Sequence, residues 1–191
     1  MAGNKITWLG QVSLYTLGGL VTSVVVGAGL GAAGGLVIPP GTHRLGIAVA
    51  LVVAVAAAMR ELGWVRLPLP ERKRQTSDLW GKTFSRPVAA TLWGLDLGLL
   101  VSTRLTFAGA WVVLLVAALT ESPWRGATLT AAYWLGRALS VWIAPLLFEN
   151  AGSTHHVLDE IDRHRHWHQM VHVLGLGVIV ATLSATLLSG A

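Results

Sequence analysis

The chain of 191 residues is 53% hydrophobic and only 12% charged, and its charged residues occur in a few clusters. This composition excludes an ordinary soluble domain and indicates a single transmembrane domain, residues 1–191, for which the lipid bilayer supplies the apolar surroundings. The net charge of +5 does not indicate binding to nucleic acid, because six of the fourteen basic residues lie between Arg66 and Arg86, beside an apolar run. A basic cytoplasmic loop over residues 66–86 explains them better.

The chain contains no cysteine, and this limits the chemistry that it can carry out by itself. It cannot form a disulfide, bind a metal through thiolates or exchange thiols with a disulfide. We expect the first apolar run to be retained as a membrane segment, because it is longer than the apolar part of a signal peptide.

Five apolar runs follow one another along the chain and predict an all-α, polytopic transmembrane protein. The first covers about residues 12–38 and the second about residues 45–64, and each is long enough to cross a bilayer. The fourth run, residues 127–147, and the fifth, residues 170–188, have the length of single crossings.

The third run, residues 87–120, is too long for one straight crossing. At ~1.5 Å per residue it would extend about 50 Å, whereas the hydrocarbon core is about 30 Å thick. We therefore expect a broken or re-entrant helix near residues 94–104, where Gly94 and Gly98 precede Ser102 and Thr103.

The positive-inside rule distinguishes one crossing of this run from two. With the 66–86 loop in the cytoplasm, a single broken crossing places nine basic residues inside and two outside. A turn back near Arg104 places eight inside and four outside. We therefore expect five crossings of the inner or plasma membrane, with six as the alternative. In the five-crossing topology the amino terminus is cytoplasmic and the carboxyl terminus lies outside.

Two glycine patterns overlap in the first apolar run. Gly29, Gly31 and Gly34 match the GxGxxG pattern of dinucleotide-binding proteins, but no strand precedes them, so the match is accidental. Glycines that recur every fourth residue form a small-residue stripe on one helix face, which favours close packing by another helix. This helix-packing stripe consists of Gly27, Gly31 and Gly35.

Asp96 lies deep in the third apolar run, where a carboxylate costs several kcal/mol unless it is paired, protonated or hydrated. Arg137 lies near the middle of the fourth run and could meet Asp96 at a similar depth. The two side chains would form either a charge pair in a conduit or a structural clamp between helices, and Arg137 could instead extend to the membrane surface. The predicted polar intramembrane site consists of Asp96, Arg137, Ser102, Thr103 and Arg104.

Residues 148–169 form a histidine-rich stretch with two interpretations. His164, His168 and His172 recur every fourth residue, so on a helix they could bind zinc or another divalent metal from one face. The same region reads as an amphipathic segment at the membrane surface that contacts anionic lipid headgroups. We favour the second interpretation and expect no cofactor, because no HExxH motif or cysteine supports a metal site.

The segment RPVAATLWGLDLGLLVSTR, which begins at Arg86, together with AAYWLGRAL, which begins at Ala131, resembles the second half of the DsbD/CcdA-type transmembrane domain in the LysE-like transporter grouping. In that family a broken helix carries a cysteine next to a proline, and paired cysteines pass reducing equivalents across the membrane. Here Ser102, Thr103 and Arg104 occupy the corresponding region. The resemblance therefore implies a fold with broken helices, while the electron transfer is impossible without a thiol.

Three functions remain open from the sequence. The first is a small transporter, or a component of one, with a polar site around Asp96. The second is a non-catalytic subunit that packs into a larger membrane complex with other subunits or with copies of itself, and the third is metal handling through the histidines. We do not expect an enzyme, because no nucleophile with its base, carboxylate pair or cofactor motif occurs in one place.

Overall fold

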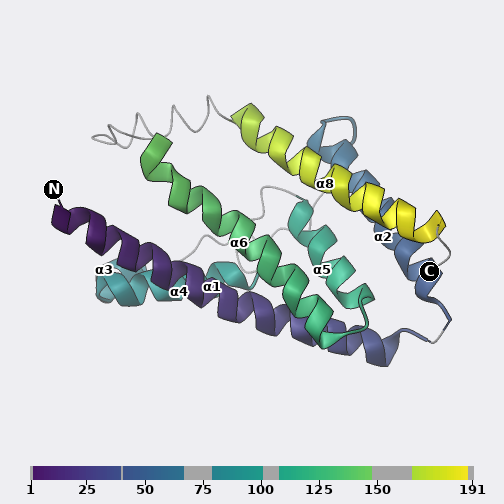
Figure 1. The fold of residues 1–191 in the computed structure, drawn as a ribbon, viewed down its shortest axis with the longest axis horizontal. Coiled ribbons are helices and arrows are strands. Elements are labelled where there is room, and N and C mark those ends of the chain that lie inside the picture. Colours follow the sequence, from purple (N-terminus) through teal and green to yellow (C-terminus); the bar gives the residue numbers. More distant parts are fainter. Residues whose placement is uncertain (1, 40, 67–78, 101–107, 148–164, 189–191) are drawn as a thin grey trace.

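A computed structural model describes residues 2–39, 41–66, 79–100, 108–147 and 165–188, and this part of the chain is helical without any strand. Figure 1 shows the order of the helices. They are α1 (Ala2–Val37), α2 (His43–Glu61), α3 (Leu79–Thr83), α4 (Arg86–Gly98), α5 (Gly109–Leu119), α6 (Pro123–Leu147) and α8 (Arg165–Leu188).

Local sequence explains several of the helix ends. Gly41, in the turn after α1, has a φ of 90°, and Gly63, just after α2, has a φ of 77°. Both values lie in the left-handed region that glycine adopts without steric cost. Pro123 is the first residue of α6, and α4 has a proline in its first turn. Proline suits these positions, because the first backbone N–H groups of a helix have no partner inside the helix.

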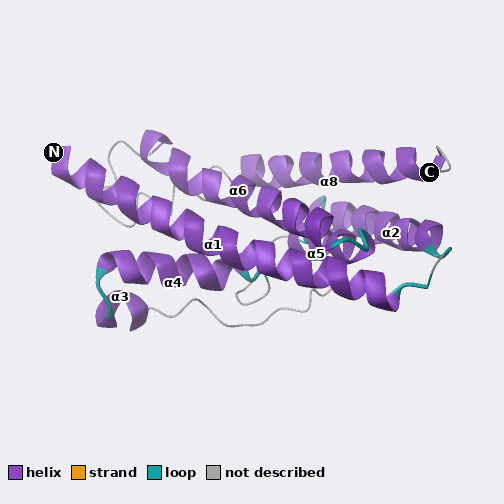
Figure 2. Ribbon diagram, turned by 60° about the horizontal axis from the view of Figure 1, so that its bottom comes forward, coloured by secondary structure: helices purple, strands orange, loops and turns teal. Residues whose placement is uncertain are grey.

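The helices form two groups that α5 joins. In the first group α1 packs against α4 on one side and α6 on the other, as Figure 2 shows. In the second group α2 packs against α8. α5 contacts α1, α2 and α6, so it holds the groups together. The apolar core beside α5 contains Ala54, Ala57, Ala108, Val112 and Leu176.

The third apolar run breaks, and both of its parts point in the same direction. A Cβ atom placed on Gly94 would meet the Tyr15 carbonyl of α1, and one placed on Gly98 would meet Gly19 and Thr22, so α4 runs parallel to α1. Further along, Gly34 of α1 faces Ala118 of α5. The run therefore passes along the bundle once, as a broken helix, and the break expected near residues 94–104 is confirmed.

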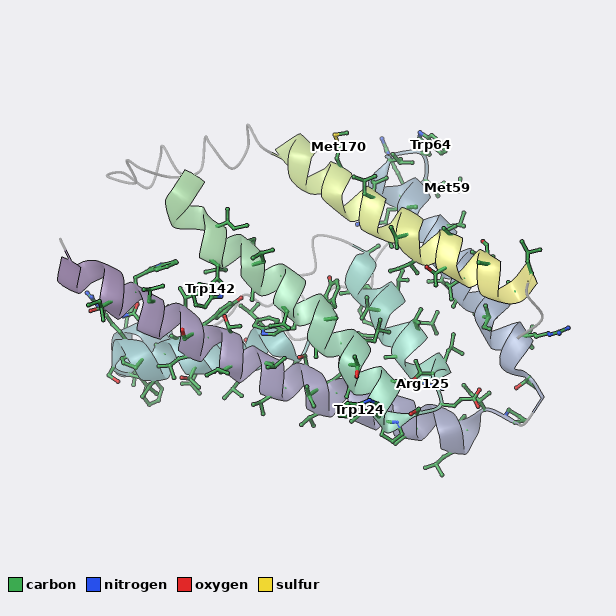
Figure 3. All side chains as sticks on the ribbon, in the orientation of Figure 1. Met59, Trp64, Trp124, Arg125, Trp142 and Met170 are labelled. Carbon is green, nitrogen blue, oxygen red and sulfur yellow. The ribbon has the colours of Figure 1, made fainter. Side chains whose placement is uncertain are left out.

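The remaining helices alternate in direction. Gly46 of α2 lies against Leu119 of α5, and Glu61 of α2 lies against Ala108, so α2 is antiparallel to α5. α6 is antiparallel to α1. In Figure 3 the start of α8, at Met170, lies beside the end of α2, at Met59, so these packed helices are also antiparallel. In the described residues the chain thus passes along the bundle five times.

The outer surface of this bundle is apolar. Val25 of α1, Val52 of α2 and Val178 of α8 are each about two-thirds exposed, at 65%, 68% and 67%. Among the described residues, one helical stretch, Ile6–Val37, is long and apolar enough to cross a membrane, and Gly109–Leu119 and Val173–Ala185 are shorter apolar helices. Such a surface would aggregate in water but matches the interior of a bilayer. The all-α membrane fold expected from the sequence is confirmed.

Candidate functional site

The break between α4 and α5 lies inside the bundle and exposes the polar ends of two helices to an apolar environment. At the end of α4, the backbone N–H groups of Leu99 and Leu100 donate to the Asp96 and Leu97 carbonyls, both at 3.2 Å. Leu100 has a φ of 64°, which a non-glycine residue seldom adopts. The start of α5 needs acceptors for its first N–H groups, because these have no partner within the helix.

Glu61, the last residue of α2, supplies one of these acceptors. Its Oε1 atom accepts a hydrogen bond of 2.8 Å from the backbone N–H of Ala108, and the side chain is almost completely buried. The same oxygen forms an ion pair of 3.2 Å with the Arg60 guanidinium. A carboxylate at a helix amino terminus is stabilised by the helix dipole and by the free N–H groups. Glu61 therefore connects the end of α2 to the break.

Glu61 is a site residue that the sequence patterns did not indicate. The residue lies in the Met-Arg-Glu sequence at the end of an apolar run, close to the basic 66–86 loop, which is typical of a membrane surface. A usable signal was present, because Arg60 and Glu61 lie before Leu62 and Trp64 and thus still inside the apolar run. Charged residues within membrane segments are rare and are usually paired.

A second group of polar side chains lies on α6. Tyr133 and Arg137 are four residues apart and therefore share a helix face. Arg137 is near enough to the phenols of Tyr133 and of Tyr15, in α1, for its charge to act on both. The charge of Glu61 also acts on Tyr133. Tyr133 is thus within electrostatic range of both the carboxylate at the break and the guanidinium of α6.

Asp96 and Arg137 are not brought together. Asp96 is partly buried in α4, between Gly94 and Gly98, which pack against α1. Within the described residues no ion pair joins Asp96 to Arg137. The reason is the arrangement of the helices, because α1 lies between α4 and α6 (Figure 2). A shared depth in the membrane does not make two side chains neighbours.

The other predicted site residues lie mostly outside the part that the structure describes. Ser102, Thr103 and Arg104 belong to the undescribed segment 101–107, and His164 belongs to 148–164. The backbone of His168 and His172 lies in the first turns of α8. Within the described residues, no group of three or more His, Cys, Asp or Glu side chains could hold a metal ion.

The glycine stripe lies against the start of α6 and the turn before it. A Cβ on Gly27 would overlap the Thr130 hydroxyl, and one on Gly31 would overlap the Ser122 carbonyl. At Gly35 the Cβ would lie 3.0 Å from the Glu121 carbonyl. A second glycine contact, which the sequence patterns did not indicate, joins Gly18 and Gly19 of α1 to Gly94 and Gly98 of α4.

Hydrogen bonds from α6 to α1 fix the position of α6, which forms one side of the site. The Trp134 indole is fully buried and donates from Nε1 to the Thr16 carbonyl at 2.9 Å. Two turns further along α6, Trp142 donates from Nε1 to the Thr16 hydroxyl at 3.0 Å, and Figure 3 shows Trp142 between the two helices. The buried Thr130 hydroxyl donates to the Ser23 carbonyl at 2.7 Å. These contacts hold the helix turns that carry Tyr133 and Arg137 against α1.

Comparison with known proteins places this architecture in a family. The cytochrome c biogenesis protein transmembrane region matches residues 2–184, so the resemblance extends well beyond the last hundred residues that the sequence patterns indicated. The methylamine utilization protein MauF of Paracoccus versutus is 28% identical over 137 residues, which are 71% of this chain and 50% of that protein. The chain thus spans about half the length of this relative. No solved structure matches the chain significantly. The chain belongs to the family of the cytochrome c biogenesis protein transmembrane region.

Proposed function

We propose that this chain is a multi-pass protein of the inner or plasma membrane that acts in transport, either alone or as a component of a larger transporter. Its polar path would pass the break between α4 and α5, where Glu61 accepts a hydrogen bond from the start of α5 and its charge acts on Tyr133. Broken helices inside a membrane leave backbone groups that can line a site for a polar substrate.

The observation that carries this proposal is the buried carboxylate of Glu61 on the backbone N–H of Ala108. A bundle that only filled space would not need a charged residue at this depth, because apolar side chains of similar size stabilise a buried site at least as well as an ion pair does. Charged residues inside membrane segments commonly mark the path of a substrate or an ion. The thiol relay of the DsbD/CcdA type is excluded, because the chain has no cysteine.

A non-catalytic subunit of a larger complex is the second candidate. The observation that favours it is the absence of cysteine in a chain of this family, because any transfer of reducing equivalents would need thiols from another protein. Purification in a mild detergent distinguishes the two candidates. A stoichiometric partner favours the subunit, and a single species supports transport by this chain alone.

The absence of cysteine also makes the conduit directly testable, because any introduced thiol is the only one in the protein. A charged methanethiosulfonate reagent modifies a thiol only where water reaches it. We expect Tyr133→Cys to react in intact membranes, and Asp96→Cys provides a second probe on α4. Two controls mark the other environments: Val21→Cys, at an exposed position on the apolar surface of α1, and Ala110→Cys, at a fully buried position in α5. If neither probe reacts faster than these controls, the break is dry and the transport proposal is wrong.

A further inference from the structure

Three hydrogen-bond donors from two helices gather beside the break. Tyr133 and Arg137 share one face of α6, four residues apart. Tyr15 of α1 packs its ring against Trp134, with ring centroids 5.2 Å apart, so it lies next to the same turn of α6. Trp134 is itself fixed to α1 by its hydrogen bond to the Thr16 carbonyl. The two helices therefore hold the three side chains in a defined arrangement.

The Arg137 guanidinium forms no ion pair with a carboxylate in the described part of the chain. The ion pair found there joins Arg60 to Glu61, and Glu61 also accepts from the Ala108 N–H. Asp96 lies on α4, with α1 between it and Arg137 (Figure 2). An arginine inside an apolar bundle is costly unless an anion or several acceptors compensate its charge. Within the described residues the charge of Arg137 acts on two phenols, those of Tyr15 and Tyr133.

We propose that Arg137, Tyr15 and Tyr133 form a binding site for an oxyanion, namely a carboxylate or phosphate group, between α1 and α6. A guanidinium binds such a group through two parallel N–H donors, and the two phenols can each donate one O–H. Both tyrosines and Arg137 are only partly buried. Among the described residues, neither phenol forms a hydrogen bond with another residue.

This site deepens the transport proposal, on which it rests for its biological role, by naming the chemical class of the cargo. The oxyanion has two possible sources, a small soluble anion or the headgroup of an anionic phospholipid. The described structure favours the small anion, because Arg137 lies ten residues before the end of α6 and thus well inside the helix. The binding measurement below includes both sources.

The test uses the whole protein in nanodiscs made of phosphatidylcholine alone. The midpoint of thermal unfolding is measured in sodium phosphate, sodium acetate and sodium chloride at equal ionic strength. We expect phosphate or acetate to raise the midpoint above its value in chloride, since a ligand that binds only the folded state stabilises it. Arg137→Gln should weaken the apparent affinity by about tenfold or more, because a hydrogen bond to a charged group is lost.

Matched variants make the result specific. Arg125→Gln changes the same charge at an exposed position of the same helix and should leave the anion effect unchanged. Tyr15→Phe and Tyr133→Phe keep the packed rings, remain folded and should each weaken binding, which keeps the test valid if Arg137→Gln does not fold. Adding phosphatidylglycerol to the nanodiscs identifies a lipid headgroup as the source, if it raises the midpoint only where Arg137 is present.

The proposal is overturned if phosphate, acetate and phosphatidylglycerol all act no more strongly than chloride and phosphatidylcholine. It is also overturned if phosphate or acetate shifts the unfolding midpoint equally in Arg137→Gln and Arg125→Gln. Binding does not require an open path, so an unreactive Tyr133→Cys would end the transport proposal and leave the anion site standing. Loss of anion binding would in turn leave the accessibility of the break unaffected.

Discussion

The carboxylate of Glu61 accepts a hydrogen bond of 2.8 Å from the backbone N–H of Ala108, forty-seven residues further along the chain. This bond joins the end of α2 to the start of α5, the second half of a broken helix. Without it a buried N–H group would lack an acceptor in surroundings that contain little water. The contact therefore makes the break compatible with a membrane bundle.

Replacing Glu61 with alanine should destabilise the protein. The change removes the acceptor of the buried Ala108 N–H and should cost about 1–3 kcal/mol, the usual penalty of an unsatisfied buried group. Glu61→Gln keeps an oxygen acceptor and should cost less. The free energy of unfolding can be measured by titrating detergent-solubilised protein with sodium dodecyl sulfate. Arg125→Ala is the control, because Arg125 is a charged residue at an exposed position near the start of α6. Equal losses for the two alanine variants would show that the buried hydrogen bond contributes nothing.

Two glycines of α1 should respond in opposite ways to the same substitution. Gly27→Ala places a Cβ atom onto the Thr130 hydroxyl and the Gly126 carbonyl, so α1 and α6 must separate. The cost should be about 1–3 kcal/mol, as for other overpacked sites. Gly29→Ala meets no atom within 4 Å and should leave stability unchanged or raise it slightly. The same unfolding titration measures both, and an equally tolerated alanine at position 27 would contradict the close packing.

Asp96 and Arg137 should act independently of each other. Because α1 separates their helices, the effects of Asp96→Asn and Arg137→Gln on the free energy of unfolding should add to within ~0.5 kcal/mol in the double variant. Arg60→Gln with Glu61→Gln is the positive control, since this pair is in contact at 3.2 Å and should show a measurable coupling energy. A coupling between Asp96 and Arg137 as large as that of the control pair would mean that they meet directly.

The sequence predicted the helical class and the break because both depend on length and apolarity along the chain. A run from Pro87 to Thr120 is longer than a bilayer is thick, so it had to deviate from a straight crossing. Apolarity indicates only the part of a helix that lies in the membrane. The apolar run therefore did not show where α1 begins, which is at Ala2, ten residues before the run.

The details of the site depend on which helices are neighbours, and a single sequence does not specify this. The pairing of Asp96 with Arg137 was inferred from similar depth, but α1 lies between their helices. Glu61 was missed because its partner, the Ala108 N–H, is a backbone group that becomes available only where the helix breaks. The crossing of Gly18 and Gly19 with Gly94 and Gly98 likewise appears only when two distant segments meet.

The role of the histidines remains a prediction, since the side chains of His164, His168 and His172 lie outside the part of the structure described in detail. We expect the purified protein to contain far less than one zinc or nickel ion per chain, because this segment suits the membrane surface. Elemental analysis of the protein measures the metal content directly. A stoichiometric metal that is lost when all three histidines become alanine would establish a metal site instead.

The five-pass topology is tested most directly by labelling single cysteines from the two sides of the membrane. Because α8 lies between residues 153 and 189, the two should lie on opposite sides of the membrane, and a single passage of the run from Pro87 to Thr120 decides which residue is on which side. The positive-inside rule places residue 153 in the cytoplasm. With a membrane-impermeant maleimide, Ser153→Cys should react in inside-out vesicles and Ser189→Cys in right-side-out vesicles. Reaction of Ser153→Cys from the outside and of Ser189→Cys from the inside would contradict this topology and favour six crossings.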